Sequence, residues 1–488
     1  MITDIKHLRR FRSAKIIATL GPQSSDIETI KTLVVAGADV FRLNMSHGTQ
    51  NEHAVAFHNI RAVEKELHHP IGILSDLQGP KLRIGAFKKG SVVLENGQTF
   101  TLDKDPALGS LQRVTLPHPE IFDVAREGDT LLLDDGKIKL RIQTASSDTL
   151  VTRVETGGLL SDSKGLNVPD ITLPFSAISE KDIENLHFSC EIAVDWIALS
   201  FVQRPEDIIE ARELIQGRAL IIAKIEKPQA VMCLNSILLH ADGVMVARGD
   251  LGVELAIENV PLIQKKIVSA ARRMGKPVIV ATQMLESMIS SPVPTRAEVS
   301  DIANAVCDGA DALMLSAETA VGAYAVDVIQ TMDRIIISVE NDTFYRKLVD
   351  AARTKARDTP SDAITAAARE VAEIATISAI CTITKSGATA MRCARERPCV
   401  PIMVLTSLTK TARRLCLFWG LQCIVTHKAS QFKDAVREVN SCAKSHNFSE
   451  NGDKIIVTAG IPFDTPGTTN ILRILTVSDY IDDSEFLP

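Results

Sequence analysis

ALIIAKIEKPQAVMCLNSILLHADGVMVARGDLGVEL, residues 219–255, is the stretch that decides the fold. It contains two apolar runs without alternation, residues 220–223 and 243–247, which are typical of strands buried on both faces of a parallel sheet. Residues 228–240, between them, have the length and spacing of a crossover helix. Each run ends abruptly in charge, Lys-Ile-Glu after the first and Arg-Gly-Asp after the second. Because ligands bind at the carboxyl ends of strands in α/β folds, the two charged ends predict a shared site.

Three charged side chains define that site: Lys224, Glu226 and Asp250. The two carboxylates have no His or Cys nearby, so they offer only hard oxygen ligands, which favour a magnesium ion with open positions for substrate oxygens. Lys224 lies one pleat from Glu226 and points to the same side, where its ammonium can hold a phosphate or an enolate. The alternative is a structural ion pair between Lys224 and Glu226 at a strand end. Asp250 in register, with glycines at 249 and 252, favours the site.

The size and composition of the chain limit its class. With 488 residues it is too long for one core, so we expect two or three domains. Its 54 basic and 60 acidic residues give a net charge of −6, which argues against a nucleic-acid partner. Nine cysteines are scattered without a CxxC pair, as expected for free thiols in a reducing cytoplasm. No apolar run approaches ~18 residues and the basic N-terminus lacks an apolar segment, so we expect neither a membrane span nor a secretory signal.

A repeating strand–helix pattern covers two separate parts of the chain. Eight apolar runs that end in polar residues are the expected strands: residues 15–20, 40–44, 71–76, 196–201, 220–223, 243–247, 278–282 and 312–316. After the third run, from about residue 81 to residue 170, the apolar period drops to two, and Asn96-Gly97 and Asp135-Gly136 mark hairpin turns. Eight βα units interrupted by a small all-β insert predict a TIM (β/α)8 barrel with an inserted lid, which Pro-containing connections would let move.

A further unit, with four expected strands between helical stretches, predicts a C-terminal open α/β domain. The expected domains are a barrel of residues 1–79 and 174–350, an all-β lid of residues 80–173 and a C-terminal regulatory domain of residues 351–488. Because the C-terminal ends of all eight barrel strands converge, one pocket can contain polar side chains that are far apart in sequence: Arg42, Asn44, Asp76, Lys224, Glu226, Asp250 and Thr282.

A short polar turn, TKSGAT at residues 384–389, follows the first expected strand of the C-terminal domain. Its hydroxyls, its glycine and the helix that follows suit a phosphate held at a helix N-terminus. An ordinary capped βα turn has the same composition. The residues alone leave both interpretations open.

Several stretches of the chain resemble the pyruvate kinase family: KIIATLGP (15–22), FRLNMSHG (41–48), SDLQGPKLRIG (75–85), AKIEKP (223–228) and DGVMVARGDLGVE (242–254). The stretch 281–306, ATQMLESMISSPVPTRAEVSDIANAV, is close to diagnostic, and the resemblance extends over nearly the whole chain. It implies phosphoryl transfer from phosphoenolpyruvate to ADP, giving pyruvate and ATP, as the final step of glycolysis. The implied cofactor is Mg²⁺, with Mn²⁺ as a substitute.

The resemblance also implies a role for each matching residue. Lys224 would stabilise the transferring phosphoryl group and the enolate, and Thr282 would orient the enolate face. Glu226 and Asp250 would hold the magnesium ion. The other matches would contact substrate groups: Arg42 and Arg83 the phosphates, the amides of Ala247, Gly249 and Asp250 the substrate carboxylate, and Asn44, His47, Arg83 and Lys164 the nucleotide.

One departure from the family concerns the monovalent cation. Members that require potassium carry Thr-Lys-Gly-Pro-Glu after the aspartate, whereas residues 77–81 here are Leu-Gln-Gly-Pro-Lys. We expect the ammonium of Lys81 to replace the cation in a site formed by Asn44, Ser46, Asp76 and Leu77. The hypothesis is that K⁺ is not required.

The resemblance further implies a phosphorylated allosteric activator, bound by Thr384, Ser386, Gly387 and Thr389, and a homotetramer. Two other functions compete with this reading. A barrel lyase or aldolase acting on phosphoenolpyruvate or pyruvate would not need a lid carrying Lys164. A non-catalytic metabolite sensor would be expected to lose Lys224, Thr282 or a metal carboxylate, and all of these are present.

Overall fold

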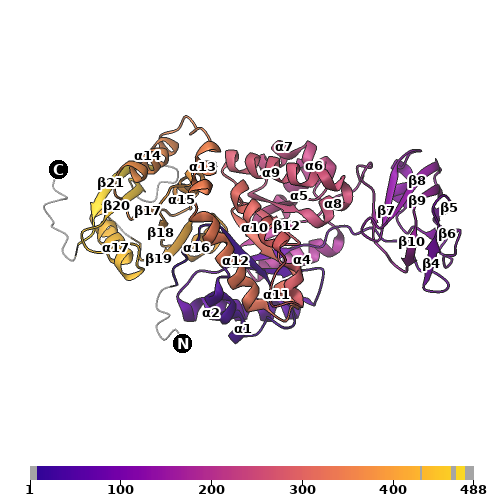
Figure 1. Ribbon diagram of the computed structural model, residues 1–488, viewed down its shortest axis with the longest axis horizontal. Helices are drawn as coiled ribbons and strands as arrows, with labels where there is room; N and C mark the ends of the chain where they lie inside the picture. The colour runs from indigo at the N-terminus through magenta and orange to yellow at the C-terminus, as the bar shows by residue number, and fades with distance from the viewer. Residues whose placement is uncertain (1–7, 429–430, 463–468, 479–488) are drawn as a thin grey trace.

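The structure is a computed structural model that describes residues 8–428, 431–462 and 469–478. Three parts follow one another along the long axis: the C-terminal sheet with β17–β21, a central barrel, and a β domain with β4–β10 at the opposite end (Figure 1). A polar stretch near the C-terminus, residues 461–470, lies partly outside the described residues. Among the helices that the structure describes, none is long and apolar enough to cross a membrane.

The central part is a closed barrel of parallel strands in the order β1-β16-β15-β14-β13-β12-β3-β2. This confirms the predicted TIM barrel and its eight apolar runs. Their side chains are almost entirely buried, as the absence of alternation indicated. The strands are β1 (Lys15–Thr19), β2 (Val40–Asn44), β3 (Gly72–Asp76), β12 (Trp196–Leu199), β13 (Leu220–Ile225), β14 (Gly243–Ala247), β15 (Val278–Ala281) and β16 (Ala312–Leu315).

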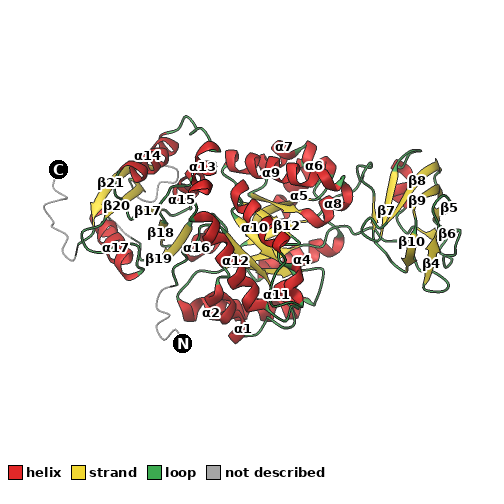
Figure 2. Cartoon of the chain, viewed as in Figure 1, coloured by secondary structure: helices red, strands yellow, loops and turns green. Residues whose placement is uncertain are grey.

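Helices surround the barrel strands (Figure 2). They are α1 (Ile27–Ala36), α2 (Gln50–Leu67), α4 (Glu180–Glu191), α5 (Pro205–Ile215), α6 (Pro228–Met232), α7 (Leu234–His240), α8 (Arg248–Glu254), α9 (Val260–Met274), α10 (Arg296–Asp308), α11 (Ala317–Ala320) and α12 (Ala325–Glu340), with the 3₁₀ turns Ile257–Asn259 and Glu286–Ile289. The prediction of a single crossover helix over residues 228–240 is wrong in detail. The chain leaves helical geometry at Cys233, which ends α6 and precedes α7.

The β domain has its own apolar core, separate from that of the barrel. One sheet has the order β11-β7-β8-β9-β5-β6, and a two-stranded sheet pairs β10 with β4. The elements are β4 (Ser91–Leu94), β5 (Thr99–Asp103), β6 (Arg113–Thr115), α3 (Pro119–Val124), β7 (Thr130–Leu133), β8 (Ile138–Ala145), β9 (Thr149–Thr156), β10 (Gly158–Ser161) and β11 (Leu166–Asn167). A domain with an independent core can move as a unit.

The C-terminal sheet has the order β19-β18-β17-β20-β21. Its elements are α13 (Thr343–Ala351), α14 (Pro360–Ile374), β17 (Ala379–Ile383), α15 (Ala388–Glu396), β18 (Ile402–Thr406), α16 (Thr409–Leu415), β19 (Leu421–Val425), α17 (Phe432–Ser445), β20 (Lys454–Gly460) and β21 (Thr469–Thr476). Strand β21 runs antiparallel to β20 and was not among the expected strands.

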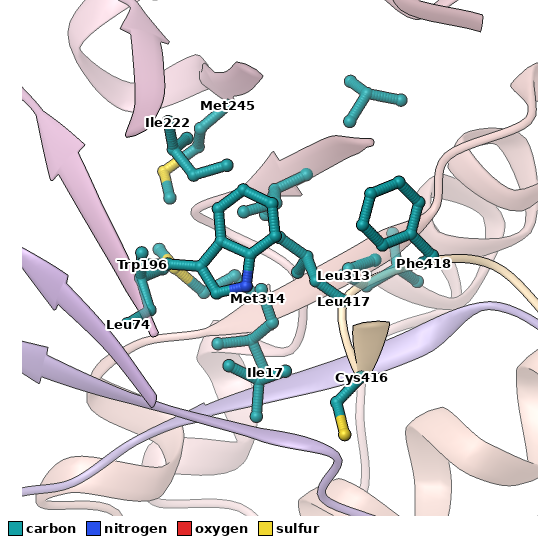
Figure 3. Close-up of a cluster of buried hydrophobic side chains, with 14 of the residues drawn as sticks. Ile17, Leu74, Trp196, Ile222, Met245, Leu313, Met314, Cys416, Leu417 and Phe418 are labelled. Carbon is teal, nitrogen blue, oxygen red and sulfur yellow. The ribbon is translucent and has the colours of Figure 1, made fainter. Parts of the chain in front are cut away.

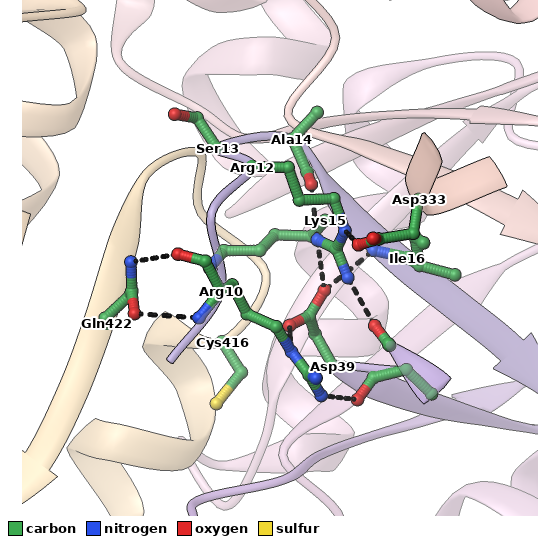
Figure 4. Close-up of polar contacts among 12 residues, drawn as sticks. Arg10, Arg12, Ser13, Ala14, Lys15, Ile16, Asp39, Asp333, Cys416 and Gln422 are labelled. Atoms are coloured by element: carbon green, nitrogen blue, oxygen red, sulfur yellow. Dashed lines mark hydrogen bonds and ion pairs between the residues drawn. The ribbon is translucent and has the colours of Figure 1, made fainter. Parts of the chain in front are cut away.

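The C-terminal domain is packed against the N-terminal ends of the barrel strands. Trp196 is the first residue of β12, and its ring centroid is 6.2 Å from that of Phe418 (Figure 3). Nearby, Asp39 forms two ion pairs with the N-terminal segment, one with Arg12 at 2.8 Å and one with Arg10 at 3.4 Å (Figure 4). The Lys15 ammonium donates to the Leu421 carbonyl at 2.6 Å. The contacts of Trp196 and Lys15 attach the C-terminal domain to the end of the barrel opposite the carboxyl ends of its strands.

Candidate active site

Lys224 lies at the centre of a polar cluster at the carboxyl ends of three barrel strands. Its Nζ is 2.9 Å from Glu226 Oε1 and 3.2 Å from Asp76 Oδ1, and it donates to Ser200 Oγ at 2.7 Å. Burial disfavours the ammonium, but the carboxylates of Asp76, Glu226 and Asp250 outweigh it and raise the pKa of Lys224. The side chain therefore stays charged and is held from several directions.

Asp76 connects Lys224 to a second cation. Arg42 donates from Nε to Asp76 Oδ2 at 2.7 Å and from Nη1 to Thr19 Oγ1 at 3.2 Å. Burial opposes ionisation of Asp76, yet Lys224 and Arg42 together lower its pKa. The predicted convergence of β2, β3 and β13 thus brings two cations onto one buried carboxylate.

Glu226 is a buried carboxylate with too little compensating charge. Burial raises its pKa, the neighbouring Asp250 carboxylate adds to the rise, and Lys224 opposes both. The Phe201 N–H orients it by donating to Oε2 at 2.7 Å. Two adjacent oxygen donors that repel one another fit a divalent cation. Among the described residues, no group of three or more His, Cys, Asp or Glu side chains is placed for a metal.

Thr282 follows β15 in a rare backbone conformation. Its φ is +69°, an outlier for a β-branched residue and typical of positions where structure is held for function. Its hydroxyl donates to the Ala281 carbonyl at 2.7 Å and accepts from the Gly249 N–H at 2.9 Å. Arg248 stabilises this turn. Its Nη2 donates to the Thr282 carbonyl at 2.6 Å, and its Nη1 pairs with Asp301 at 2.7 Å.

Sequence reasoning missed three residues that support this cluster: Ser200, Phe201 and Arg248. Each lies directly after a barrel strand, Ser200 and Phe201 after β12 and Arg248 after β14. Their position directly after a predicted strand was the signal in the sequence that could have identified them. Their contacts depend on backbone geometry that a single sequence does not display, such as the φ of +56° at Phe201.

Other expected site residues lie outside the cluster around Lys224. Asn44 pairs in register with Asp76, and its Oδ1 accepts from the Ser46 N–H at 3.2 Å. His47 is exposed. In the lid, Arg83 donates to the Ser163 carbonyl at 2.8 Å, and Lys164 pairs with Asp134 at 2.7 Å.

Lys81 is exposed, and the structure does not bring it to the expected cation site. Its Cε lies 3.9 Å from the point that a Cβ on Gly165 would occupy, so the side chain runs along the lid. No hydrogen bond or ion pair joins it to Asn44, Ser46 or Asp76, all of which the structure describes. Leu77, beside Asp76, is buried.

The turn at 384–389 begins α15. Gly387 adopts φ +88°, and its N–H donates to Thr384 Oγ1 at 3.0 Å. The Thr389 hydroxyl shares a 2.6 Å hydrogen bond with the Thr469 hydroxyl, whereas Ser386 is exposed. Thr384 and Thr389 therefore have partners inside the protein, and Ser386 faces outward.

Comparison with known proteins agrees with this architecture. The model of the pyruvate kinase barrel domain matches residues 11–329, and that of the pyruvate kinase alpha/beta domain matches residues 362–475. A pyruvate kinase of Methylorubrum extorquens is 51% identical over 96% of this chain and 98% of its own length. One from Mycobacterium tuberculosis is 41% identical over 96% and 99%. The crystal structure of a pyruvate kinase from Cryptosporidium parvum superposes with a TM-score of 0.90 at 33% identity, covering 96% of both chains. The chain therefore belongs to the pyruvate kinase family and is a phosphotransferase.

Proposed function

We propose that Lys224 is the centre of phosphoryl transfer from phosphoenolpyruvate to ADP. The observation that carries this proposal is the buried ammonium of Lys224 between Asp76, Glu226 and Ser200. Phosphoryl transfer develops spread negative charge and needs little covalent work, so a preorganised cation is the main contribution a protein can make. Three fixed partners hold the ammonium in place before substrate arrives, so little reorganisation is left for the reaction itself.

Arg42 completes the cationic side of the proposed site. Asp76 holds Arg42 and Lys224 at fixed positions on its two oxygens. Arg42 would contact the phosphoryl group of phosphoenolpyruvate while Lys224 would contact both this group and the enolate oxygen. An arginine suits this position because its planar fork matches phosphate oxygens.

Glu226 and Asp250 would hold the magnesium ion, for which manganese could substitute. The bound ion supplies positive charge that neutralises the phosphoryl and substrate oxygens. The raised pKa of Glu226 and the proximity of Asp250 support the assignment, because the charge of Lys224 does not outweigh burial and the Asp250 carboxylate at Glu226. The Phe201 N–H fixes the orientation of Glu226.

The β14–α8 connection would bind the substrate carboxylate through the amides of Ala247, Gly249 and Asp250. Gly249 and Asp250 belong to the first turn of α8, where amides have no partner within the helix. In the structure the Gly249 N–H donates to Thr282 Oγ1, so the substrate carboxylate would take this N–H over and leave the hydroxyl beside it. There it would orient the enolate face and the water that delivers the proton to carbon, since a hydroxyl is itself a weak acid.

The nucleotide would lie between the barrel and the lid, in contact with Asn44, His47, Arg83 and Lys164. Lys164 would have to leave Asp134 when the lid closes on ADP. A partly exposed ion pair of this kind contributes only about 0.2–1 kcal/mol, so a nucleotide phosphate can replace the carboxylate.

Pyruvate release tests this function directly. The proposal requires that phosphoenolpyruvate be converted to pyruvate only when both ADP and a divalent ion are present, with one ATP formed for each pyruvate. Pyruvate formation without ADP would favour a lyase. No turnover with tight binding of phosphoenolpyruvate would favour a sensor.

We also propose that K⁺ is not required, because Lys81 stands where potassium-dependent members carry a glutamate. Lys81 lies at the start of the lid, so lid closure would carry its ammonium toward Asp76. Wild type is expected to keep most of its activity when tetramethylammonium replaces all K⁺ and NH₄⁺. Lys81→Glu should lose about tenfold or more in that buffer and recover with KCl, since a carboxylate there needs a cation. Nearly complete loss for the wild type, restored by KCl, would contradict the proposal, and Lys88→Glu in the lid provides the charge-matched control.

The 384–389 turn is proposed to bind a phosphorylated activator, and the protein is proposed to be a cytoplasmic homotetramer. The exposed Ser386 hydroxyl at the start of α15 supports the activator site, and the nine unpaired cysteines support the cytoplasm. The homotetramer is proposed from the family resemblance alone. With a sugar phosphate or nucleotide monophosphate that lowers half-saturation by phosphoenolpyruvate, the Ser386→Ala/Thr389→Ala double variant should lose that response. Ser407→Ala, in the turn after the neighbouring strand β18, should retain it. An unchanged response in the double variant would remove the site.

A further inference from the structure

The chain returns from the lid to the barrel through a short connection after β11. It begins at Asn167, the last residue of β11, and ends at Leu173. Leu173 is already fixed to the barrel, because its N–H donates at 2.9 Å to Oε1 of Gln203, in the segment after β12. Rotation of the lid about this connection is therefore confined to residues 167–172.

Glu254 joins the lid to the barrel at the start of this connection. It is the last residue of α8, the helix whose first turn contains Asp250. Its Oε1 accepts a hydrogen bond from Asn167 Nδ2 at 2.8 Å and pairs with Lys227 Nζ at 3.1 Å. Lys227 directly follows Glu226 in the sequence. One carboxylate oxygen thus contacts the lid and the segment of one proposed metal ligand, while its own helix contains the other.

The contact among Asn167, Lys227 and Glu254, called here the hinge contact, is buried on its barrel side. The side chains of Lys227 and Glu254 are only 2% and 1% exposed. A buried ion pair requires good geometry and hydrogen bonds for its remaining polar groups, and Asn167 donates one of these from the lid. Because neither charged side chain can turn into solvent, a shift of either barrel segment must be felt at Asn167.

Gln229 holds the same connection further along. It belongs to the first turn of α6, and its Nε2 donates to the carbonyls of Pro169 at 3.2 Å and of Ile171 at 3.3 Å. Between them, Asp170 Oδ2 accepts from the N–H of Thr130, the first residue of β7, at 2.8 Å. The connection is therefore bonded to the barrel on one side and to a lid strand on the other.

Helix α8 also contacts the lid directly. It lies on the side of the barrel nearest the lid (Figure 1). A Cβ on Gly136, in the turn between β7 and β8, would lie 3.5 Å from Val253 Cγ1. The same turn contains Asp134, the ion-pair partner of Lys164. The position of α8 therefore bears on the part of the lid that is proposed to meet the nucleotide.

We propose that Glu254 and Gln229 are positioning residues that couple occupation of the metal site to the orientation of the lid. The inference rests on the proposed roles of Glu226 and Asp250 as metal ligands. A cation held between these carboxylates would set the distance between their two segments, and the hinge contact connects those segments to the lid. Coupling is reciprocal, so a change on the lid side must alter metal affinity by the factor with which the metal alters the lid.

Asn167→Ala tests this coupling, because it removes the lid donor and leaves the ion pair between Lys227 and Glu254 in place. Electron paramagnetic resonance should show Mn²⁺ binding weakened about threefold, the effect of losing one modest hydrogen bond. The KM for ADP should rise about fivefold while that for phosphoenolpyruvate changes less than about twofold, because a smaller fraction of the enzyme holds the lid ready to close. Gln98→Ala is the control, since it removes a lid amide that donates to the Leu111 carbonyl at 3.2 Å.

Hydrogen exchange gives a readout that needs no turnover. In the wild type, Mn²⁺ should slow the exchange of amides in residues 168–172, because it fixes the segments that hold them. This slowing should be lost in Asn167→Ala and in Gln229→Met, which removes both bonds to the connection at nearly constant side-chain length. Gln98→Ala should keep it.

Exchanging the two groups of the hinge contact separates positioning from simple loss of packing. Asn167→Asp places a second carboxylate beside Glu254, and Glu254→Gln removes the charge that pairs with Lys227, so each should raise the KM for ADP about tenfold. In the Asn167→Asp/Glu254→Gln double variant the amide and the carboxylate change sides, and Lys227 keeps one acidic partner. Mn²⁺ affinity and the KM for ADP should return to within about twofold of wild type.

Unchanged Mn²⁺ affinity and unchanged hydrogen exchange in both Asn167→Ala and Gln229→Met would overturn the proposal. Losses that add in the double variant would do so as well, because they would show that the two residues act separately. Pyruvate release decides the proposed reaction on its own. A failure of that reaction in an enzyme that still shows the Mn²⁺-dependent exchange would leave the coupling established.

Discussion

Lys224→Met is expected to lower kcat by about 10³-fold or more while the KM for phosphoenolpyruvate changes by less than about tenfold. The ammonium faces charge that develops during transfer, so its loss removes stabilisation of the transition state more than binding of the ground state. Arg42 and the amides after β14 remain to bind the substrate. A coupled pyruvate-release assay under saturating phosphoenolpyruvate, ADP and Mg²⁺ measures the effect.

Stability must be measured beside activity, because methionine leaves Glu226 without its ion-pair partner and Asp76 with Arg42 alone. Breaking a buried pair in this way can cost about 3–5 kcal/mol, which thermal unfolding would report. Lys265→Met is the control, since it removes an ion-paired lysine from α9, outside the site. Lys224→Arg keeps the charge but changes its shape, so it should retain a small part of the activity. A folded Lys224→Met enzyme with kcat within about tenfold of wild type would exclude a central role for this residue.

The barrel and much of its site were predictable from the sequence for a simple physical reason. Strands buried on both faces need uninterrupted apolar runs, and side chains that follow them must be polar because they meet solvent or ligand. Lys224, Glu226 and Asp76 follow this rule and are confirmed as neighbours. Arg42 adjoins Asp76 for the same reason.

What could not be predicted depends on tertiary geometry. The hydrogen bond from Phe201 to Glu226 requires a positive φ at a phenylalanine, which no propensity anticipates. The break between α6 and α7 arises at Cys233, inside a stretch whose apolar spacing suits one continuous helix. The positions of Lys81 and Lys164 depend on how the lid is oriented, and the sequence carries no signal for that angle.

Glu226→Gln should weaken Mn²⁺ binding by about 100-fold and lower kcat/KM by about 10³-fold at subsaturating metal. Glutamine has nearly the same shape and can still accept the hydrogen bond from Phe201, so the fold should be little affected. It is also a much weaker metal ligand, because it carries no charge. Electron paramagnetic resonance of free Mn²⁺ measures the binding separately from turnover. Glu298→Gln, at the cap of α10, is the control for removing one carboxylate elsewhere in the barrel.

The pairing of Glu226 with Asp250 makes a sharper prediction about the same ion. If both carboxylates hold one cation, the loss of one ligand already releases the ion. The Glu226→Gln/Asp250→Asn double variant should then bind Mn²⁺ only slightly less tightly than whichever single variant has the lower Mn²⁺ affinity. The two groups interact in the structure, since the Asp250 charge contributes to the raised pKa of Glu226. Two independent effects that add in free energy would mean that the carboxylates act at different places. No effect of Asp250→Asn alone on Mn²⁺ affinity would instead mean that Asp250 serves the substrate carboxylate through its backbone amide.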